Sequence, residues 1–174
     1  MATLELLAEH GFGGITMSAI ASRADVARQT LYNHYPDVES VVYAATVAHQ
    51  NQSFELLAAM LKTIASPAGR LEHLVRHNAA LAEHGHPSLR GGFSSEIEAL
   101  IAGHDAAVRS LVENTLRTGR DNGDFRHDLD LDHDPLLVQR MIEATGELVA
   151  RAPGDIASIV AACVRSVLAA VAAR

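Results

Sequence analysis

Several residue types are scarce in this chain of 174 residues, and each scarcity excludes a class of structure. Tryptophan is absent and aromatic residues make up only 4% of the chain, so a core must be built mainly from aliphatic side chains and alanine. The single cysteine, Cys163, excludes an intramolecular disulfide, and its apolar neighbours favour a small core residue over a redox centre. No basic leader with an apolar stretch opens the sequence, so we expect a cytoplasmic protein.

Positive charge is also scarce, because 14 Lys and Arg residues face 21 Asp and Glu residues, for a formal net charge of −7. This balance excludes a protein that coats nucleic acid nonspecifically, since such proteins are usually strongly basic. The longest apolar run, residues 156–173, has three polar interruptions, which are Ser158, Arg165 and Ser166. We therefore interpret it as a buried helix and expect no membrane span.

Hydrophobic residues make up 48% of the sequence, and they recur at helical spacing without any alternating strand pattern. The pattern predicts an all-α fold of about nine helices, bounded by glycine, proline and capping residues. We expect one helix that ends at His10, one that follows Thr16, and further helices over residues 27–35, 37–65, 67–83, 87–102, 104–122, 134–152 and 154–173. The long helix from residue 37 is expected to join two halves of the chain.

The first 36 residues are predicted to hold three short helices, with a tight turn at Asp25-Val26 before the third. This is the spacing of a helix-turn-helix. The segment contains three characteristic groups, which are Gly11-Phe12-Gly13-Gly14-Ile15-Thr16, Ile20-Ala21 and Thr30-Leu31-Tyr32-Asn33-His34-Tyr35. In these groups it resembles the tetracycline-repressor (TetR) family of transcription regulators.

The resemblance implies an N-terminal three-helix DNA-binding domain, residues 1–45, and a C-terminal ligand-binding and dimerisation domain, residues 46–174. It implies a ligand-responsive regulator, most simply a repressor that a small molecule releases from a palindromic DNA operator. Such a protein is not an enzyme and needs no cofactor. The expected effector is a small hydrophobic or amphipathic molecule.

A recognition helix must offer short or forked hydrogen-bonding side chains to base edges and to phosphates. Residues 27–35 supply such a set, which consists of Arg28, Gln29, Thr30, Tyr32, Asn33 and His34. The resemblance implies that Arg28 and Gln29 read bases and that the hydroxyl groups and His34 contact phosphates, while Leu31 and Tyr35 face inward. Thr16, the expected helix cap, completes the predicted DNA-binding residues.

The predicted DNA-binding segment has a formal charge of −3, because Arg23 and Arg28 are outnumbered by Glu5, Glu9, Asp25, Asp37 and Glu39. Val38 stands where the family usually has a lysine, and Ala27 stands where a capping serine or threonine is usual. We therefore expect modest DNA affinity with a shallow salt dependence. The alternative function is a helical dimeric module that binds a ligand or a protein and has weak or lost DNA binding.

The C-terminal domain carries the predicted ligand pocket and the predicted dimer interface. In the family the pocket lies inside the C-terminal bundle, and a glycine-broken stretch at residues 90–93 can open space there. The candidate ligand-binding residues are His77, Asn78, Phe93, Glu96 and Met141. The last two helices, about 134–152 and 154–173, have more apolar positions than one buried stripe, so we expect them to pair with a second copy as a four-helix bundle.

Three other patterns are weaker, and we expect no metal site. His73 and His77 lie one helical turn apart but lack an evident third ligand. The aspartates of residues 128–134 lack the glycine and the final glutamate of a calcium loop, so Asp134 is interpreted as the cap of a helix that begins at Pro135. Residues 92–96 do not match a hydrolase nucleophile turn, and no strand precedes them.

Overall fold

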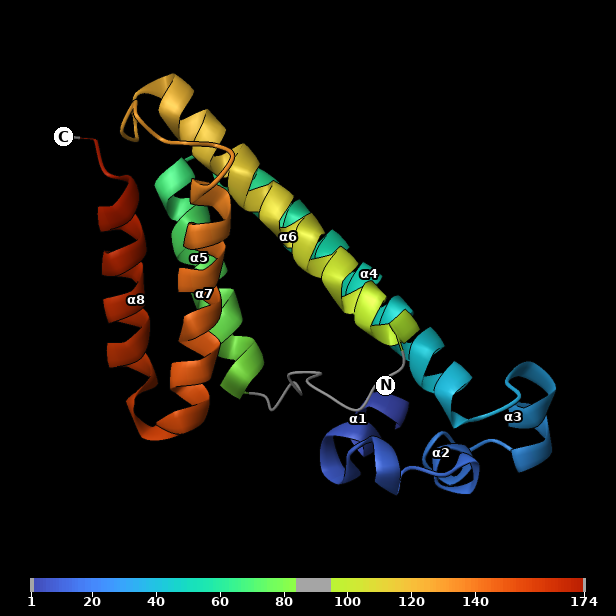
Figure 1. Ribbon diagram of the computed structural model, residues 1–174. Helices are drawn as coiled ribbons and strands as arrows, with labels where there is room; N and C mark the ends of the chain where they lie inside the picture. The colour runs from blue at the N-terminus through green and yellow to red at the C-terminus, as the bar shows by residue number, and fades with distance from the viewer. Residues whose placement is uncertain (1, 84–94, 174) are drawn as a thin grey trace. The chain divides into compact units, whose positions relative to one another are not determined.

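The computed structural model describes residues 2–83 and 95–173, and these residues confirm the all-α prediction (Figure 1). They form eight α-helices, and among them the only extended pairing is one isolated bridge between Phe125 and Ala172. The helices belong to two compact units. The first unit contains the described residues up to 55 together with 95–104, and the second contains 56–83 together with 105–173.

The first unit contains three short helices and most of a long one, together with residues 95–104. These helices are α1 (Ala2–His10), α2 (Met17–Arg23), α3 (Arg28–His34) and α4 (Val38–Thr63). Gly11 follows α1 with φ of 65°, a conformation that favours glycine. Asp25 has φ of 54° in the turn between α2 and α3, as the sequence predicted.

The first unit has its own hydrophobic core, which fixes the angles between its short helices. The buried members are Leu6, Leu7, Ile15, Met17, Ile20, Ala21, Leu31, Val41 and Val42. They come from α1, the following turn, α2, α3 and the first turns of α4. Leu31 is the buried residue of α3, so this helix is held by one face only.

Thr16 caps α2, and its replacement by alanine is expected to lower the free energy of unfolding by about 1 kcal/mol. The Thr16 hydroxyl oxygen accepts a hydrogen bond from the Ala19 N–H at 3.1 Å, which satisfies an N–H group that the helix itself leaves unpaired. Urea denaturation of the two proteins measures the difference. Thr16→Ser keeps the hydroxyl and should retain most of the stability, and equal losses in both variants would contradict the capping role.

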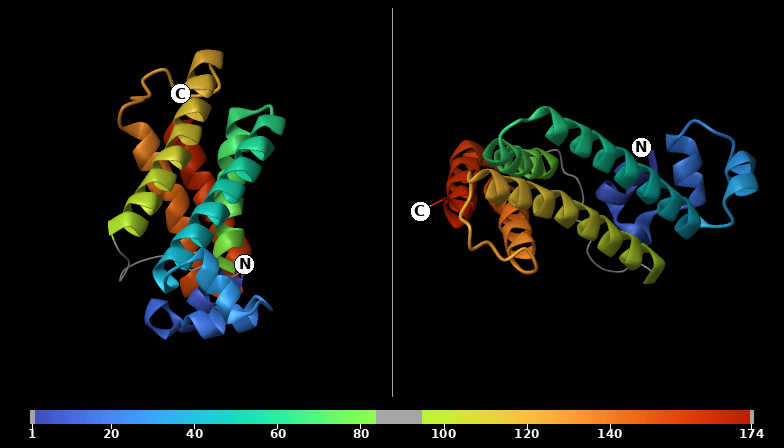
Figure 2. Two further views of the ribbon diagram at one scale, coloured as in Figure 1. Left: turned by 90° about the vertical axis from the view of Figure 1, so that its right-hand side faces the viewer. Right: turned by 90° about the horizontal axis from the view of Figure 1, so that it is seen from above.

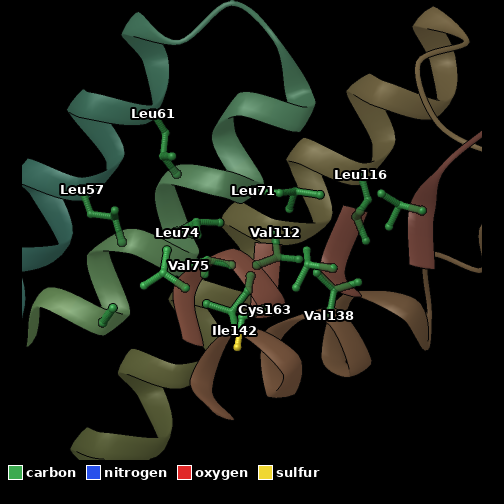
Figure 3. Close-up of a cluster of buried hydrophobic side chains, with 14 of the residues drawn as sticks. Leu57, Leu61, Leu71, Leu74, Val75, Val112, Leu116, Val138, Ile142 and Cys163 are labelled. Carbon is green, nitrogen blue, oxygen red and sulfur yellow. The ribbon is translucent and has the colours of Figure 1, made fainter. Parts of the chain in front are cut away.

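The second unit is a bundle built from α5 (Pro67–Glu83), α7 (Asp134–Arg151), α8 (Ile156–Val171) and the later part of α6 (Ser95–Asn122). Helix α5 lies against both α7 and α8 (Figure 2). Leucine and valine side chains from these helices and from the end of α4 point toward one another in the core (Figure 3). Cys163 lies in this core, as its apolar neighbours predicted.

Helix α6 corrects one prediction, because the helices expected at 87–102 and 104–122 are continuous across Gly103. Residues 87–94 lie outside the described residues. A glycine inside a helix costs about 1 kcal/mol relative to alanine, but it does not block the helical backbone. Alanines at 99, 102, 106 and 107 are strong helix formers on both sides of Gly103, and the helix continues through the position.

The segment between α6 and α7 folds back on α8. The Phe125 N–H donates to the Gly119 carbonyl at 3.0 Å, and the Arg126 N–H donates to the Val171 carbonyl at 2.9 Å. The Arg126 guanidinium also donates to the Asp134 carboxylate at 3.0 Å. The prediction that Asp134 caps a helix starting at Pro135 is therefore wrong: α7 begins at Asp134, whose carboxylate is bound by Arg126 and by the Asp130 N–H.

Candidate nucleic-acid interface

Helix α3 presents its polar side chains to solvent. The six residues predicted to contact DNA from this helix are all exposed, and they are Arg28, Gln29, Thr30, Tyr32, Asn33 and His34. Leu31 is buried, and Tyr35 is half-buried against the same core. The helix is therefore anchored by one apolar face. The opposite face is accessible and could enter the major groove of DNA.

Two pairs of polar side chains on α3 hold each other one helical turn apart. The Arg28 guanidinium donates to the Tyr32 hydroxyl at 3.3 Å and lies 5.3 Å from the centre of the Tyr32 ring. The Gln29 amide donates to the Asn33 amide oxygen at 3.1 Å. Exposed hydrogen bonds of this kind contribute little to stability, so both pairs can exchange these partners for base edges and phosphates.

The start of α3 lacks a side-chain cap, as expected from Ala27. Ala27 occupies the N-cap of α3 and makes no side-chain hydrogen bond to the helix. The cap residue of α2, Thr16, is exposed and carries such a bond. The N–H groups in the first turn of α2 therefore have a side-chain partner at the cap, whereas those of α3 do not. Helix α3 depends more on Leu31 and on the preceding turn for its position.

Arg23 of α2 is bound to acidic residues of α1 and is not a free cation. Its guanidinium donates to Glu9 at 2.8 and 3.1 Å and lies 3.5 Å from Glu5. The hydrogen bond from Arg23 lowers the pKa of Glu9.

Hydrogen bonds from the backbone and side chain of Ser40 lower the pKa of Asp37. The carboxylates of Glu9 and Asp37 therefore stay ionised at neutral pH. Arg28 is the arginine on the exposed face of α3.

Each of the two units has an open hollow among its described residues. One, of about 390 Å³, is in the first unit and is lined by Asp37, Glu39, Ser40, Tyr43 and Glu96. The other, of about 450 Å³, is in the second unit and is lined by Arg76, Glu83 and alanines of α5 and by Ile156, Val160 and alanines of α8. Glu96 was a predicted ligand-binding residue, and it lines the first of these hollows together with two other carboxylates.

The other predicted ligand-binding residues have separate surroundings. His77 on α5 is half-buried and stacks on His73, with ring centres 6.3 Å apart. The Asn78 amide oxygen accepts a hydrogen bond from the Gly146 N–H at 3.1 Å, and Met141 packs against the core of the second unit. Phe93 lies outside the described residues. No group of three or more potential metal ligands occurs within residues 2–83 and 95–173.

Among the described residues, four buried polar atoms without a hydrogen-bond partner were not anticipated from the sequence. They are Thr46 Oγ1, Gln50 Oε1, Gln139 Oε1 and Thr145 Oγ1. The signal that could have found the last of them is its spacing, because Thr145 falls on the same helical stripe as Val138, Ile142 and Val149. A polar residue on a buried stripe needs a partner or an explanation.

Comparison with known proteins gives one family match, which covers the first unit's short helices. Residues 1–45 match the family of bacterial regulatory proteins described as the tetR family. The search of curated protein sequences finds no match.

Solved regulators share the fold of nearly the whole chain at low sequence identity. FadR from Bacillus subtilis, solved with stearoyl-CoA, has a TM-score of 0.80 at 20% identity, over 95% of this chain and 94% of that one. A transcriptional regulator from Saccharomonospora viridis, solved with choline, has a TM-score of 0.81 at 20% identity, over 99% and 95%. A TetR family regulator from Agrobacterium tumefaciens has a TM-score of 0.78 at 17% identity, over 98% and 93%.

Proposed function

We propose that this chain, a TetR-family protein by its N-terminal domain and its all-helical fold, is a ligand-responsive DNA-binding repressor that a small molecule releases from a palindromic operator. The observation that carries the proposal is the exposure of all six polar side chains of α3, on a helix anchored by the buried Leu31. Arg28 and Gln29 are assigned to base edges. Contacts to phosphates are assigned to Thr30, Tyr32 and His34, and Asn33 is a further DNA-binding residue. Thr16 positions α2.

The division of labour follows the predicted domains. Residues 1–45 bind DNA, and residues 46–174 bind the effector and form the dimer. An effector acts only by binding the DNA-competent and released conformations with different affinity. Two structural neighbours were solved with stearoyl-CoA, which is amphipathic, and with choline, which is small, and these ligands support a small-molecule effector here, which we assign to the hydrophobic or amphipathic class. The proposed setting is the cytoplasm, and the chain is assigned no catalysis and no cofactor.

A homodimer through α7 and α8 is part of the proposal, and the exposure of these helices supports it. Leu136, Leu137 and Leu148 of α7 are exposed. The segment Pro153–Val171 has a mean hydropathy of 1.7, is long and apolar enough to cross a membrane by composition, and yet is only 22% buried. Arg165 is costly in a bilayer, so a second copy of the chain covers this surface better than lipid does.

The alternative is a dimeric ligand-binding or protein-interaction module that has weak or lost DNA binding. Its support is electrostatic, because Arg23 is neutralised by Glu9 and Glu5, and Val38 replaces a phosphate-binding lysine. Operator binding separates the two functions directly.

Arg28→Ala is expected to relax base preference at one operator position by about 1 to 3 kcal/mol, because a forked guanidinium can bind a guanine edge at two points. Val38→Lys should instead tighten binding to every sequence alike and steepen the salt dependence. DNA fragments selected by the purified protein are titrated at two salt concentrations with wild type and both variants. If wild type binds no palindrome better than random DNA, and Val38→Lys does not help, the alternative module is the better account.

A further inference from the structure

Gln139 on α7 has a buried oxygen without a partner. The residue is 2% exposed, and its Oε1 atom accepts no hydrogen bond. Leaving an amide oxygen unsatisfied in an apolar interior is unfavourable, so such an atom in a folded protein calls for a specific explanation. A ligand that supplies the missing donor is one such explanation.

The orientation of the Gln139 amide is fixed by its nitrogen. The Nε2 group donates to the Asp105 carbonyl at 3.1 Å and to the Glu143 carboxylate at 2.8 Å. A flipped amide would place Oε1 against two acceptors, which is repulsive. Oε1 must therefore point away from both partners, and because it can only accept, whatever satisfies it has to be a donor.

Gln139 belongs to a polar strip of α7 that is hydrogen-bonded to α5 and α6. Gln139, Glu143 and Gly146 are spaced four and three residues apart, so they lie along one side of α7. Across from this strip, Asn78 on α5 accepts the Gly146 N–H, and a Cβ at position 146 would lie 2.5 Å from the Asn78 oxygen. Glu143 keeps 29% of its side-chain exposure, so the strip reaches solvent at its middle.

We propose that Gln139 Oε1 is the polar anchor of the effector site, and that the effector carries a hydroxyl or N–H donor on an apolar body. The inference rests on the proposed function, because it names the chemical class that the regulator senses. A molecule whose only polar atoms are acceptors would leave Oε1 unsatisfied, so the site discriminates between donors and acceptors of equal size and hydrophobicity. Gln139 acts as a binding residue, and Glu143 positions its amide.

The test uses two isomeric probes, octan-1-ol and 1-methoxyheptane, which differ in whether their oxygen carries a proton. Calorimetric titration and thermal shift of the full-length protein should give about tenfold tighter binding of the alcohol, the gain typical of one buried hydrogen bond. Gln139→Met keeps the side-chain length but removes the oxygen, and it should bind both isomers equally. Equal affinities in wild type, or no binding of either isomer, would overturn the inference.

Thr145→Val is the matched control, because it removes another buried unpartnered oxygen from the same helix without touching the polar strip. It should keep the tenfold preference for the alcohol, and loss of that preference would show that Gln139 is not the anchor. Operator titration without any probe is run in parallel. A protein that binds its palindrome but does not discriminate the isomers loses this inference while the regulatory function stands.

Discussion

Phe125→Ala is expected to lower the free energy of unfolding by about 3 to 5 kcal/mol, the range for removing a fully buried phenylalanine. Phe125 is 2% exposed and belongs to the core of the second unit. Its ring lies directly over Gly119 of α6, and its N–H donates to the Gly119 carbonyl. Truncation leaves a cavity that the rigid helix backbone cannot close. Urea denaturation followed by circular dichroism measures the change, and a loss below about 1 kcal/mol would contradict this packing.

Gly119 and Gly103 lie on the same helix and provide a matched pair of controls. A Cβ on Gly119 would lie 2.1 Å from the Phe125 ring, whereas a Cβ on Gly103 meets nothing within 4 Å. Gly119→Ala should therefore destabilise the protein by about 1 to 3 kcal/mol through overpacking. Gly103→Ala should stabilise it by about 0.5 to 1 kcal/mol, because alanine is the better helix residue. The same sign for both substitutions would show that Phe125 does not pack on Gly119.

Local signals in the sequence were sufficient to predict the helix end, the helix cap and the turn among the first three helices. Gly11, Thr16 and Asp25 end, cap and turn the chain through properties of the single residue, and the structure gives each the expected conformation or hydrogen bond. Gly103 was misleading for the same reason, because a glycine signal is local while the continuity of α6 depends on the residues on both sides. Boundaries based on one glycine are therefore weaker than boundaries based on a cap and a turn together.

Contacts between distant residues were not predictable from periodicity. The packing of Phe125 on Gly119 and the bond from Arg126 to Val171 need the loop to return to α8, and no local pattern encodes that return. Gln139 was missed for a related reason. Glutamine is usually an exposed residue, but here the Gln139 amide is buried and bound to the Asp105 carbonyl of α6. By contrast, the exposed residues of α3 follow from the motif, because Leu31 alone anchors a two-turn helix.

Leu137→Glu is expected to convert the proposed dimer to a monomer at micromolar concentration. Leu137 is 59% exposed on α7, and Leu148 lies further along the exposed side of the same helix. Burying one leucine contributes about 1.5 to 3 kcal/mol, and two-fold symmetry counts each substitution twice. A buried carboxylate adds a desolvation cost, so the dimer dissociation constant should rise at least about 100-fold. Sedimentation or light scattering measures the mass, and a monomeric wild type would contradict the proposed interface.

Leu56→Glu is the control for exposed leucines in general. Leu56 is 65% exposed, more than Leu137, but it lies on α4 outside the proposed interface. This variant should remain dimeric and keep its operator affinity. If Leu56→Glu also gives a monomer, the interface includes α4, and the assignment to α7 and α8 alone is wrong.

The consequence for DNA binding is larger than the loss of one contact, because a palindrome is read by two recognition helices held at a fixed separation of about one helical turn, roughly 34 Å. A monomer meets one half-site at a time and loses the high effective concentration that the second half-site otherwise experiences, which is typically worth 10² to 10⁴ in affinity. Leu137→Glu should therefore abolish the preference for a palindrome over an isolated half-site while leaving α3 intact. Arg28→Ala should do the reverse, relaxing base preference in each half-site while the protein stays dimeric. A Leu137→Glu monomer that still prefers the palindrome would show that dimerisation does not set the operator geometry.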